Sequence, residues 1–327
     1  MWGDPISTQD WSALTRIPAK RDFYARETYF REGLDDIGRA FGDHRHTAAG
    51  LRTSALLMLK PDGLAAGKLR PVLDYLDAQG FRVVAARTLH FTRYHWRELW
   101  RYQLTSATLD RLAVNDCLLL AGPALTLMLA DTGTHELPAT VRLSQLKGSA
   151  TLEAQKPGTL RSLLGQPNRV LSYIHVADEP ADLVRELGLL FEPAERRELI
   201  DGLVRGELSP AHRDVLDEAL ALYPPPGRRL SAQDAVERVT RGVRETPGTG
   251  PDEVRARAGL LDRLAAMERG ERVEWLPFLH DLETLGIRPD RWDLAVLGTS
   301  FIVYDEPGQP KVLVNPDPET WKAASAR

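Results

Sequence analysis

The segment SALLMLKPDG, residues 54–63, runs from six uncharged residues into a turn. Its first part has the length of a β-strand, and the sequence Pro61-Asp62-Gly63 ends it. From this segment to residue 191, strand and helix signals alternate. They predict helix over 64–79, strand over 81–92, helix over 93–112, strand over 118–130, helix over 137–146, strand over 170–174 and helix over 182–191. This order predicts an α+β fold of the ferredoxin-like sandwich type, with an antiparallel or mixed sheet and helices on one face.

The chain on either side of this unit has a different character. Residues 1–50 are predicted to form an N-terminal helical arm with a helix over 22–41. Residues 196–327 are predicted to be a mostly helical extension that ends in a β-hairpin, with strands over 294–304 and 311–314. The predicted domains are therefore 1–50, 51–195 and 196–327.

The composition excludes several functional classes. Hydrophobic residues make up 43% of the chain, which is ordinary for a globular protein. The net charge of −4 provides no overall basic field for nucleic acid, although a local cationic pocket remains compatible with it. A single cysteine, Cys117, and an N-terminus without a signal pattern favour the cytoplasm. No apolar run is long enough to span a membrane.

Residues suited to phosphoryl transfer recur around the strand that precedes His175, in the sequence YIHVAD (residues 173–178). Lys60 follows the first strand, Arg161 lies in the loop KPGTLR (156–161), and Glu186 lies eleven residues after His175. A nucleophilic imidazole, two cations and an orienting carboxylate are the components of such a site. Taken singly, His175 would be interpreted as a buried core histidine and the charged residues as surface groups.

Two further groups have simpler interpretations. Trp96 and Trp100 lie four residues apart on one helix face, which is more typical of a core than of a base-stacking platform. The sequence Asp43-His44-Arg45-His46 is more typical of a solvated turn than of a metal site.

Residues 54–193 resemble the nucleoside diphosphate kinase family. The resemblance rests on Lys60-Pro61-Asp62, on the helix and strand over 72–84, on Pro157-Gly158-Thr159-Leu160-Arg161, and on His175 with the following Glu186, Gly188 and 191–193. It covers a little under half of the chain. The four motifs occur in the order in which they occur in the family.

The resemblance implies a role for each matched residue. It implies that His175 takes the γ-phosphoryl group of ATP or another nucleoside triphosphate and passes it to an acceptor. Glu186 would orient the imidazole ring, and Lys60 and Arg161 would neutralise the transferring oxygens. Arg142 would contact a more distal phosphate.

The resemblance also implies nucleotide contacts and partners. Trp100 stands where the family has a tyrosine near the catalytic histidine, and Thr151 adjoins Ala150, which stands at the position of the loop threonine. Mg²⁺ would arrive with the nucleotide, so no dedicated metal site is expected. The expected partners are a nucleotide and a small-molecule acceptor, and the chain is expected to form a homo-oligomer.

The sequence departs from the family next to the histidine. The family's Arg-Asn pair before it is replaced by Leu171-Ser172, and a serine after it is replaced by Ala177. Asn168 could take the role of the sugar-binding asparagine only if the loop is remodelled. Two hypotheses follow: a phosphotransferase whose acceptor need not be a standard nucleoside diphosphate, or a catalytically inactive nucleotide-binding or scaffold module.

Overall fold

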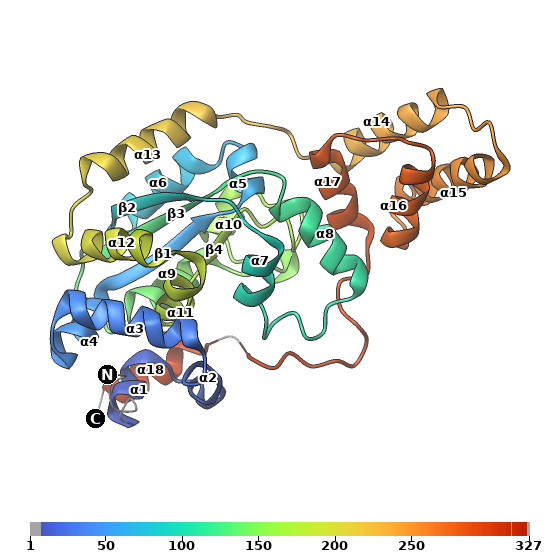
Figure 1. The fold of residues 1–327 in the computed structure, drawn as a ribbon. Coiled ribbons are helices and arrows are strands. Elements are labelled where there is room, and N and C mark those ends of the chain that lie inside the picture. The colour runs from blue at the N-terminus through green and yellow to red at the C-terminus, as the bar shows by residue number, and fades with distance from the viewer. Residues whose placement is uncertain (1–7, 315, 326–327) are drawn as a thin grey trace.

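A four-stranded antiparallel sheet forms the centre of the molecule in the computed structural model, which describes residues 8–314 and 316–325 (Figure 1). The spatial order is β2-β3-β1-β4, so β1 and β3 are the central strands. The strand bounds are β1 Ser54–Leu59, β2 Phe81–Leu89, β3 Ala124–Asp131 and β4 Ile174–Val176. The predicted order of strands and helices in residues 51–195 is confirmed, and so is the α+β sandwich class.

Helices cover both faces of the sheet, so the prediction of helices on one face is wrong. One face packs against α3 (Thr28–Phe41), α11 (Pro180–Leu190) and α12 (Pro193–Arg205), and the other against α5 (Pro61–Ala65), α6 (Leu69–Ala78), α9 (Ala139–Lys147), α10 (Leu160–Leu164) and α13 (Pro210–Leu222). The reason lies in β1, which is buried at every position. Because strand side chains alternate between faces, Leu56 and Met58 enter one core and Leu57 and Leu59 the other.

Two predicted elements between β2 and β3 have different bounds in the structure. The predicted helix over 93–112 is divided into α7 (Arg93–Leu99) and α8 (Leu109–Leu119), because the Thr108 hydroxyl accepts a hydrogen bond from the Arg111 amide and begins a new helix there. The predicted strand over 118–130 begins only at Ala124. Leu118 and Leu119 belong to the buried face of α8, so the apolar run spans a helix end and a strand.

The N-terminal arm contains α1 (Thr8–Leu14), α2 (Pro18–Tyr24), α3 and α4 (His44–Thr53). The single helix predicted over 22–41 is therefore interrupted at residues 25–27. The predicted solvated turn at residues 43–46 is the start of α4, where Asp43 accepts a hydrogen bond from the His46 amide at 2.9 Å. Asp43 thus acts as a helix N-cap.

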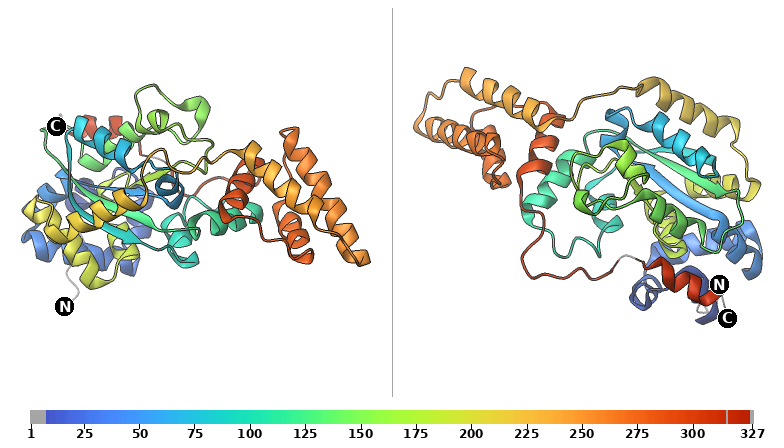
Figure 2. Two further views of the ribbon diagram at one scale, coloured as in Figure 1. Left: turned by 90° about the horizontal axis from the view of Figure 1, so that it is seen from above. Right: turned by 180° about the vertical axis from the view of Figure 1, so that it is seen from behind.

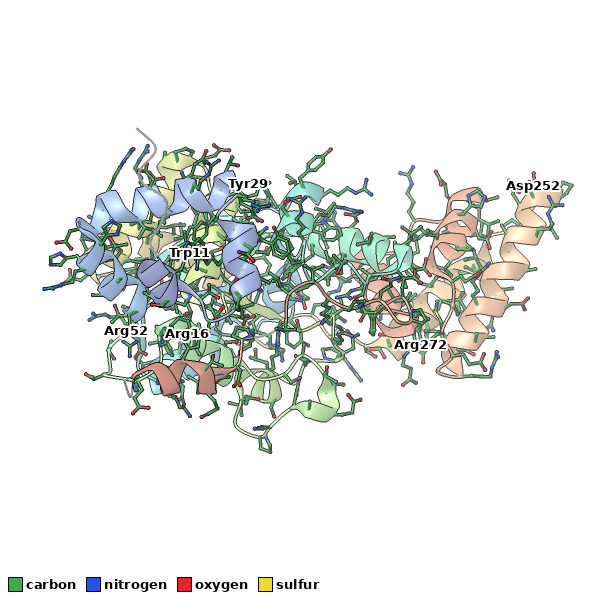
Figure 3. All side chains as sticks on the ribbon, turned by 90° about the horizontal axis from the view of Figure 1, so that it is seen from below. Trp11, Arg16, Tyr29, Arg52, Asp252 and Arg272 are labelled. Carbon is green, nitrogen blue, oxygen red and sulfur yellow. The ribbon has the colours of Figure 1, made fainter. Side chains whose placement is uncertain are left out.

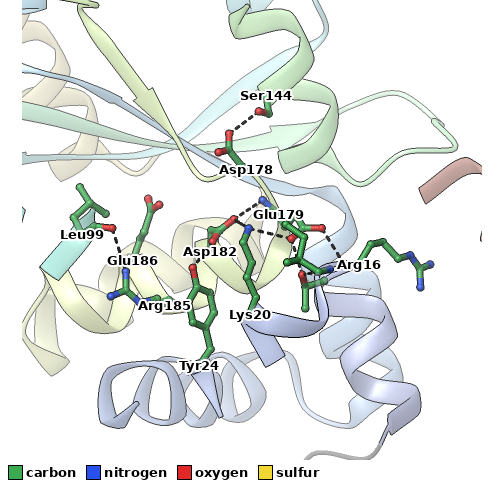
Figure 4. Close-up of polar contacts among 12 residues, drawn as sticks. Arg16, Lys20, Tyr24, Leu99, Ser144, Asp178, Glu179, Asp182, Arg185 and Glu186 are labelled. Atoms are coloured by element: carbon green, nitrogen blue, oxygen red, sulfur yellow. Dashed lines mark hydrogen bonds and ion pairs between the residues drawn. The ribbon is translucent and has the colours of Figure 1, made fainter. Parts of the chain in front are cut away.

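Contacts at the start of α11 hold the arm against the domain (Figure 4). The buried Lys20 ammonium lies 3.0 Å from Glu179 and 2.6 Å from Asp182, and the Tyr24 hydroxyl donates to Asp182 at 2.8 Å. The Thr15 hydroxyl donates to Glu179 at 2.6 Å. Both carboxylates are buried, and their ion pairs and hydrogen bonds offset the free-energy cost of removing them from water.

The C-terminal extension is helical. Beyond α12 and α13, which cover the sheet, it contains α14 (Ala232–Glu245), α15 (Pro251–Glu268), α16 (Trp275–Thr284), α17 (Arg291–Phe301) and α18 (Pro318–Ser325). Figures 1 and 2 show α14, α15 and α16 projecting to one side of the sheet, and Figure 3 places Asp252 of α15 at the opposite end of the molecule from Trp11 of the arm. Asp110 of α8 anchors the extension by accepting from the Trp275 amide at 2.9 Å.

The β-hairpin predicted at the end of the extension is wrong. Most of the predicted strand over 294–304 lies in α17, which Asp290 caps by accepting from the Trp292 amide at 2.8 Å. The apolar residues Ala295, Val296 and Leu297 are consecutive because α17 is buried on several sides. Residues 311–313 and Val314 form no strand, and the chain there runs past α7 and α8 toward α18. Within the described part of the chain, no helix is long and apolar enough to cross a membrane.

Two glycines allow the arm to approach α11 closely. A Cβ atom at Gly188 would collide with the Tyr29 carbonyl oxygen, and one at Gly33 would collide with the Val184 carbonyl oxygen. In contrast, Gly38 on the same helix α3 has no atom within 4 Å of its Cβ position.

We therefore predict that Gly188→Ala destabilises the protein by about 1–3 kcal/mol, because the added methyl group forces α3 and α11 apart. Gly38→Ala is the matched control and should change the free energy of unfolding by at most about +1 kcal/mol, in the stabilising direction. Urea unfolding of both variants measures the difference. Equal effects of the two substitutions would contradict a close helix contact at Gly188.

Candidate active site

A cavity of about 640 Å³ opens beside the carboxyl end of β1 and strand β4. Its wall is formed by the end of α7, by α8 and α9, and by the connection over 148–173 between α9 and β4. The chain over 302–314 and 316–318, which we call the C-terminal segment, completes the wall. Its described lining contains seven lysine or arginine side chains and one carboxylate, that of Asp178. A strongly cationic cavity in a chain of net charge −4 indicates an anionic ligand.

His175 lies in β4 and faces this cavity. Its Nε2 atom lies 2.9 Å from Oε1 of Glu186, which projects from α11 and is buried. The Trp100 ring meets the imidazole edge to face, with centroids 5.6 Å apart. No described residue forms a hydrogen bond with His175 Nδ1. The ring is therefore held through one nitrogen, and the other remains available for chemistry.

Lys60 is placed by the turn that follows β1. Its ammonium donates to the Val170 carbonyl oxygen at 2.7 Å and lies 3.5 Å from Asp62. Asp62 in turn accepts from the Tyr173 amide at 3.0 Å. Tyr173 has a positive φ of 61°, a sparsely populated conformation for a non-glycine residue, so the loop before β4 is strained where it meets Lys60. Burial lowers the pKa of Lys60, although Asp62 opposes the shift.

Arg161, at the start of α10, is also directed into the cavity. Its guanidinium donates to the Gly148 carbonyl oxygen at 3.0 Å and to the Ile174 carbonyl oxygen at 3.2 Å. Its Nε atom is buried and has no partner among the described residues. Burial lowers the pKa of Arg161 to about 10, against the attraction of Asp178 and Asp62. A buried cation with an unused donor favours an anion at this position.

The sequence analysis missed a charged pair in the same wall. Lys147, the last residue of α9, lies 2.7 Å from Asp178, which also accepts from the Ser144 hydroxyl at 2.5 Å. Burial alone would raise the pKa of the Asp178 carboxyl, but Lys147 and Ser144 outweigh it and hold that pKa well below its usual range. Lys147 comes from the same helix as the predicted Arg142, and nothing in the spacing of charges distinguished the two.

The structure separates the remaining predicted site residues. Trp100 and Thr151 line the cavity, and their predicted contacts with a nucleotide stay predictions. Arg142 does not, and its assignment to a distal phosphate is wrong, because its guanidinium bonds Asp131 at 3.0 Å and lies over the Phe81 ring. Asn168 does not replace the sugar-binding asparagine, because its side-chain oxygen accepts from the Val170 and Leu171 amides. Asn168 is thus held against its own loop and is not among the residues that line the cavity.

A second group of charges, also missed, lies in the cavity wall near the C-terminal segment. Arg111 of α8 and Arg169 of the loop before β4 both pair with Asp305, Arg169 at 3.0 Å. Lys311 lines the cavity and faces the same three residues. These residues belong to none of the motifs on which the resemblance rests, and they are distant in sequence, so only the folded chain reveals the group.

Together, the covered antiparallel sheet and the cationic, histidine-containing cavity define an α+β sandwich with a candidate site for an anion. The family description "Nucleoside diphosphate kinase" matches residues 53–196. The nucleoside diphosphate kinase of Moorella thermoacetica is 30% identical over 144 residues, which cover 42% of this chain and 93% of that protein. That of Archaeoglobus fulgidus is 25% identical over 143 residues, covering 42% and 86%. The chain thus belongs to the nucleoside diphosphate kinase family, as the resemblance predicted.

Solved structures of nucleoside diphosphate kinases align with the same part of the chain. The enzyme from Aquifex aeolicus covers 44% of this chain and 97% of its own, at 22% identity and a TM-score of 0.37. The halophilic enzyme from Halobacterium salinarum, solved in complex with CDP, covers 43% and 89%, at 21% identity and a TM-score of 0.36.

The Lys147–Asp178 pair predicts a specific pH dependence of stability. The folded-state pKa of Asp178 lies below its unfolded value of about 3.9, so the pair stabilises the fold above that pH and the contribution is lost as the pH falls. Asp178→Asn should therefore cost about 2 kcal/mol at pH 7 and progressively less below pH 4. Urea unfolding between pH 7 and pH 3 measures this difference.

Asp214→Asn is the control for the Asp178 substitution. Asp214 lies on the exposed face of α13 and pairs with no described residue, so its substitution should change stability little at any pH. A cost of Asp178→Asn that stays constant from pH 7 to pH 3 would contradict an ionised pair.

Proposed function

We propose that this protein is a nucleoside diphosphate kinase-like phosphotransferase that works through phosphorylation of His175. The observation that carries the proposal is the hydrogen bond of 2.9 Å between His175 Nε2 and the buried Glu186, in a cavity that also contains Lys60 and Arg161. Membership of the family supports phosphotransferase activity and nucleotide binding.

The hydrogen bond determines which ring nitrogen reacts. Because a carboxylate oxygen can only accept, the neutral imidazole carries its proton on Nε2 and keeps a lone pair on Nδ1. Nδ1 attacks the γ-phosphorus of a nucleoside triphosphate. A phosphorus–nitrogen bond forms, the bond to the bridging oxygen breaks, and a nucleoside diphosphate leaves. An acceptor oxygen then attacks the same phosphorus and restores the free imidazole.

The cations of the cavity serve both steps. Lys60 and Arg161 lie where their charge can offset that of the phosphoryl oxygens, and both are already desolvated, so their electrostatic effect is stronger than in water. The described residues include no group of three or more His, Cys, Asp or Glu side chains that could hold a metal ion. A Mg²⁺ ion bound to the nucleotide phosphates would neutralise further charge, and Asp178, already paired with Lys147, is not required to hold it.

The acceptor is expected to differ from a standard nucleoside diphosphate. Ser172 lies in the cavity wall where the family has its sugar-binding asparagine, and Asn168 bonds the backbone of its own loop. The C-terminal segment adds Lys311, Pro316 and Pro318 to the wall, although it lies outside the region matched to the family. These changes affect the part of the site that would recognise the acceptor. They leave His175, Lys60 and Arg161 in one cavity, with Glu186 bonded to His175 from behind the wall.

One observation favours the alternative of an inactive nucleotide-binding or scaffold module. Lys60 and Arg161 already donate hydrogen bonds to main-chain carbonyl oxygens, so part of their capacity serves the fold. Phosphoenzyme formation distinguishes the two functions. The predicted homo-oligomer and the division into domains 1–50, 51–195 and 196–327 stay predictions.

We expect incubation with γ-³²P-labelled ATP to give an acid-labile, base-stable label, as a phosphorus–nitrogen bond requires. His175→Ala should abolish it, because no nucleophile remains at that position. His280→Ala, at an exposed position of α16, is the matched control and should keep the full label. A labelled His175→Ala protein, or an unlabelled wild type that still binds ATP, would reject the catalytic proposal.

Glu186→Gln should slow labelling on the order of 10²-fold, because the amide no longer fixes the ring orientation or balances its developing positive charge. Single-turnover quench measurements give this rate. ADP affinity should stay within about twofold of wild type, because Glu186 contacts the ring and not the nucleotide. If rate and affinity fell together, Glu186 would be supporting the fold of the cavity and not the chemical step.

A further inference from the structure

The cationic group near the C-terminal segment is held by its own ion pairs with Asp305, and no described ion pair joins it to Lys60 or Arg161. Asp305 holds Arg111 and Arg169 together, and its isolated bridge with Ala107 ties this part of the segment to the loop before α8. The Val312 amide donates to the Tyr102 carbonyl oxygen at 3.2 Å, which places the neighbouring Lys311 beside the end of α7. Arg111, Arg169 and Lys311 thus come from three segments and face one cavity.

The charges of this group are not balanced within the protein. Three cations face a single carboxylate, which leaves a surplus of two positive charges. Lys311 forms no hydrogen bond with any described residue, and the Nε atom of Arg111 is buried without a partner. Arg111 is largely buried, Arg169 is partly buried and Lys311 is exposed, so the group is open to an anion from solvent, and the unused buried donor of Arg111 favours one.

The surplus identifies the kind of anion. A phosphate monoester carries between about −1.5 and −2 charges near pH 7 and offers three acceptor oxygens, whereas a carboxylate carries one charge and two oxygens. Arginine forks bind phosphate in a bidentate manner, and lysine adds a point charge. The dianionic phosphate matches both the charge and the donors of Arg111, Arg169 and Lys311.

We infer that Arg111, Arg169 and Lys311 form a second phosphate subsite, and that the acceptor carries a phosphate monoester remote from the oxygen that is phosphorylated. This inference rests on the proposed function for its reference to an acceptor. In the transfer step, the phosphorus–nitrogen bond of phosphorylated His175 breaks and a bond forms to an anionic acceptor oxygen. The remote phosphate takes no part in that exchange and serves to select and position the acceptor.

Isothermal titration of the ADP-saturated full-length protein with inorganic phosphate tests the subsite directly. We call the part of the cavity lined by His175, Lys60 and Arg161 the transfer end, and ADP is expected to occupy it. Phosphate should then bind at one remaining site, and acetate should bind at least about tenfold more weakly. An ADP complex that takes up no phosphate would overturn the inference, because the seven cations would then serve one nucleotide tail. Equal binding of acetate would overturn the assignment to phosphate.

Lys311→Glu tests the location. It should weaken phosphate binding by about tenfold or more and leave ADP binding within about twofold of wild type, because Lys311 belongs to the subsite and not to the transfer end. Arg255→Glu is the matched control, since Arg255 is exposed on α15 and far from the cavity. Arg169→Gln provides a second variant if Lys311→Glu lowers the thermal unfolding midpoint. If a folded Lys311→Glu or Arg169→Gln protein bound phosphate as tightly as the wild type, the inference would be contradicted.

The subsite and the proposed function fail separately. Labelling of His175 by ATP without phosphate binding to the ADP complex would remove only the subsite. Phosphate binding that depends on Lys311, in a protein that ATP does not label, would remove the transferase and leave a binding module with two anion subsites.

Discussion

The hydrogen bond from His175 to Glu186 joins β4 to α11, and the precision of the whole site depends on how firmly α11 is held. The neighbouring Arg185 bonds Glu27 of the arm at 2.5 Å and the Leu99 carbonyl oxygen at 3.2 Å. These contacts hold α11 in place and therefore fix the position from which Glu186 reaches the ring. The cost is a buried Glu186 Oε2 atom without a partner among the described residues, which is tolerated where chemistry needs an acceptor. The arm is therefore part of the mechanism that orients His175.

The N-terminal arm and α18 both contact the start of α11. Glu179 accepts hydrogen bonds from Thr15 of the arm and from the Trp321 indole of α18 at 3.0 Å. The C-terminal segment and α18 are consequently fixed at two points, at Asp305 beside α8 and at Trp321 beside α11, and the residues between them form part of the cavity wall. Ion pairs and hydrogen bonds thus hold an extension that lacks the family's motifs in the wall of the cavity.

The sequence predicted the order of strands and helices along the chain, and it singled out His175, Glu186, Lys60 and Arg161, because those features are local: a strand ending in a turn, or a helix at fixed spacing. It failed where one pattern has two structural interpretations. The apolar run over 294–304 matched a strand and a buried helix equally, and only packing against α8 and α14 decides for α17. It also failed where function depends on distant pairing. Arg142 and Lys147 lie five residues apart on α9, yet Arg142 pairs with Asp131 outside the cavity, whereas Lys147 pairs with Asp178 in the cavity wall.

Electrostatics then explains why recognition in this family member would rest on charge. Burial lowers the pKa of Lys60, Lys147 and Arg161, which means that each charged form is held at a cost in free energy. Asp178 and main-chain carbonyl oxygens offset only part of that cost, and an entering anion offsets the rest. Ser172 has a shorter side chain and fewer hydrogen-bonding groups than the asparagine that the resemblance places there, and the Asn168 side-chain oxygen is used by its own loop. A ligand is then distinguished mainly by how many negative charges it carries and how far apart they lie. Because cations line both the part of the cavity near His175 and the part near Lys311, a molecule with phosphate at only one end would leave the surplus positive charge of the other part unmatched.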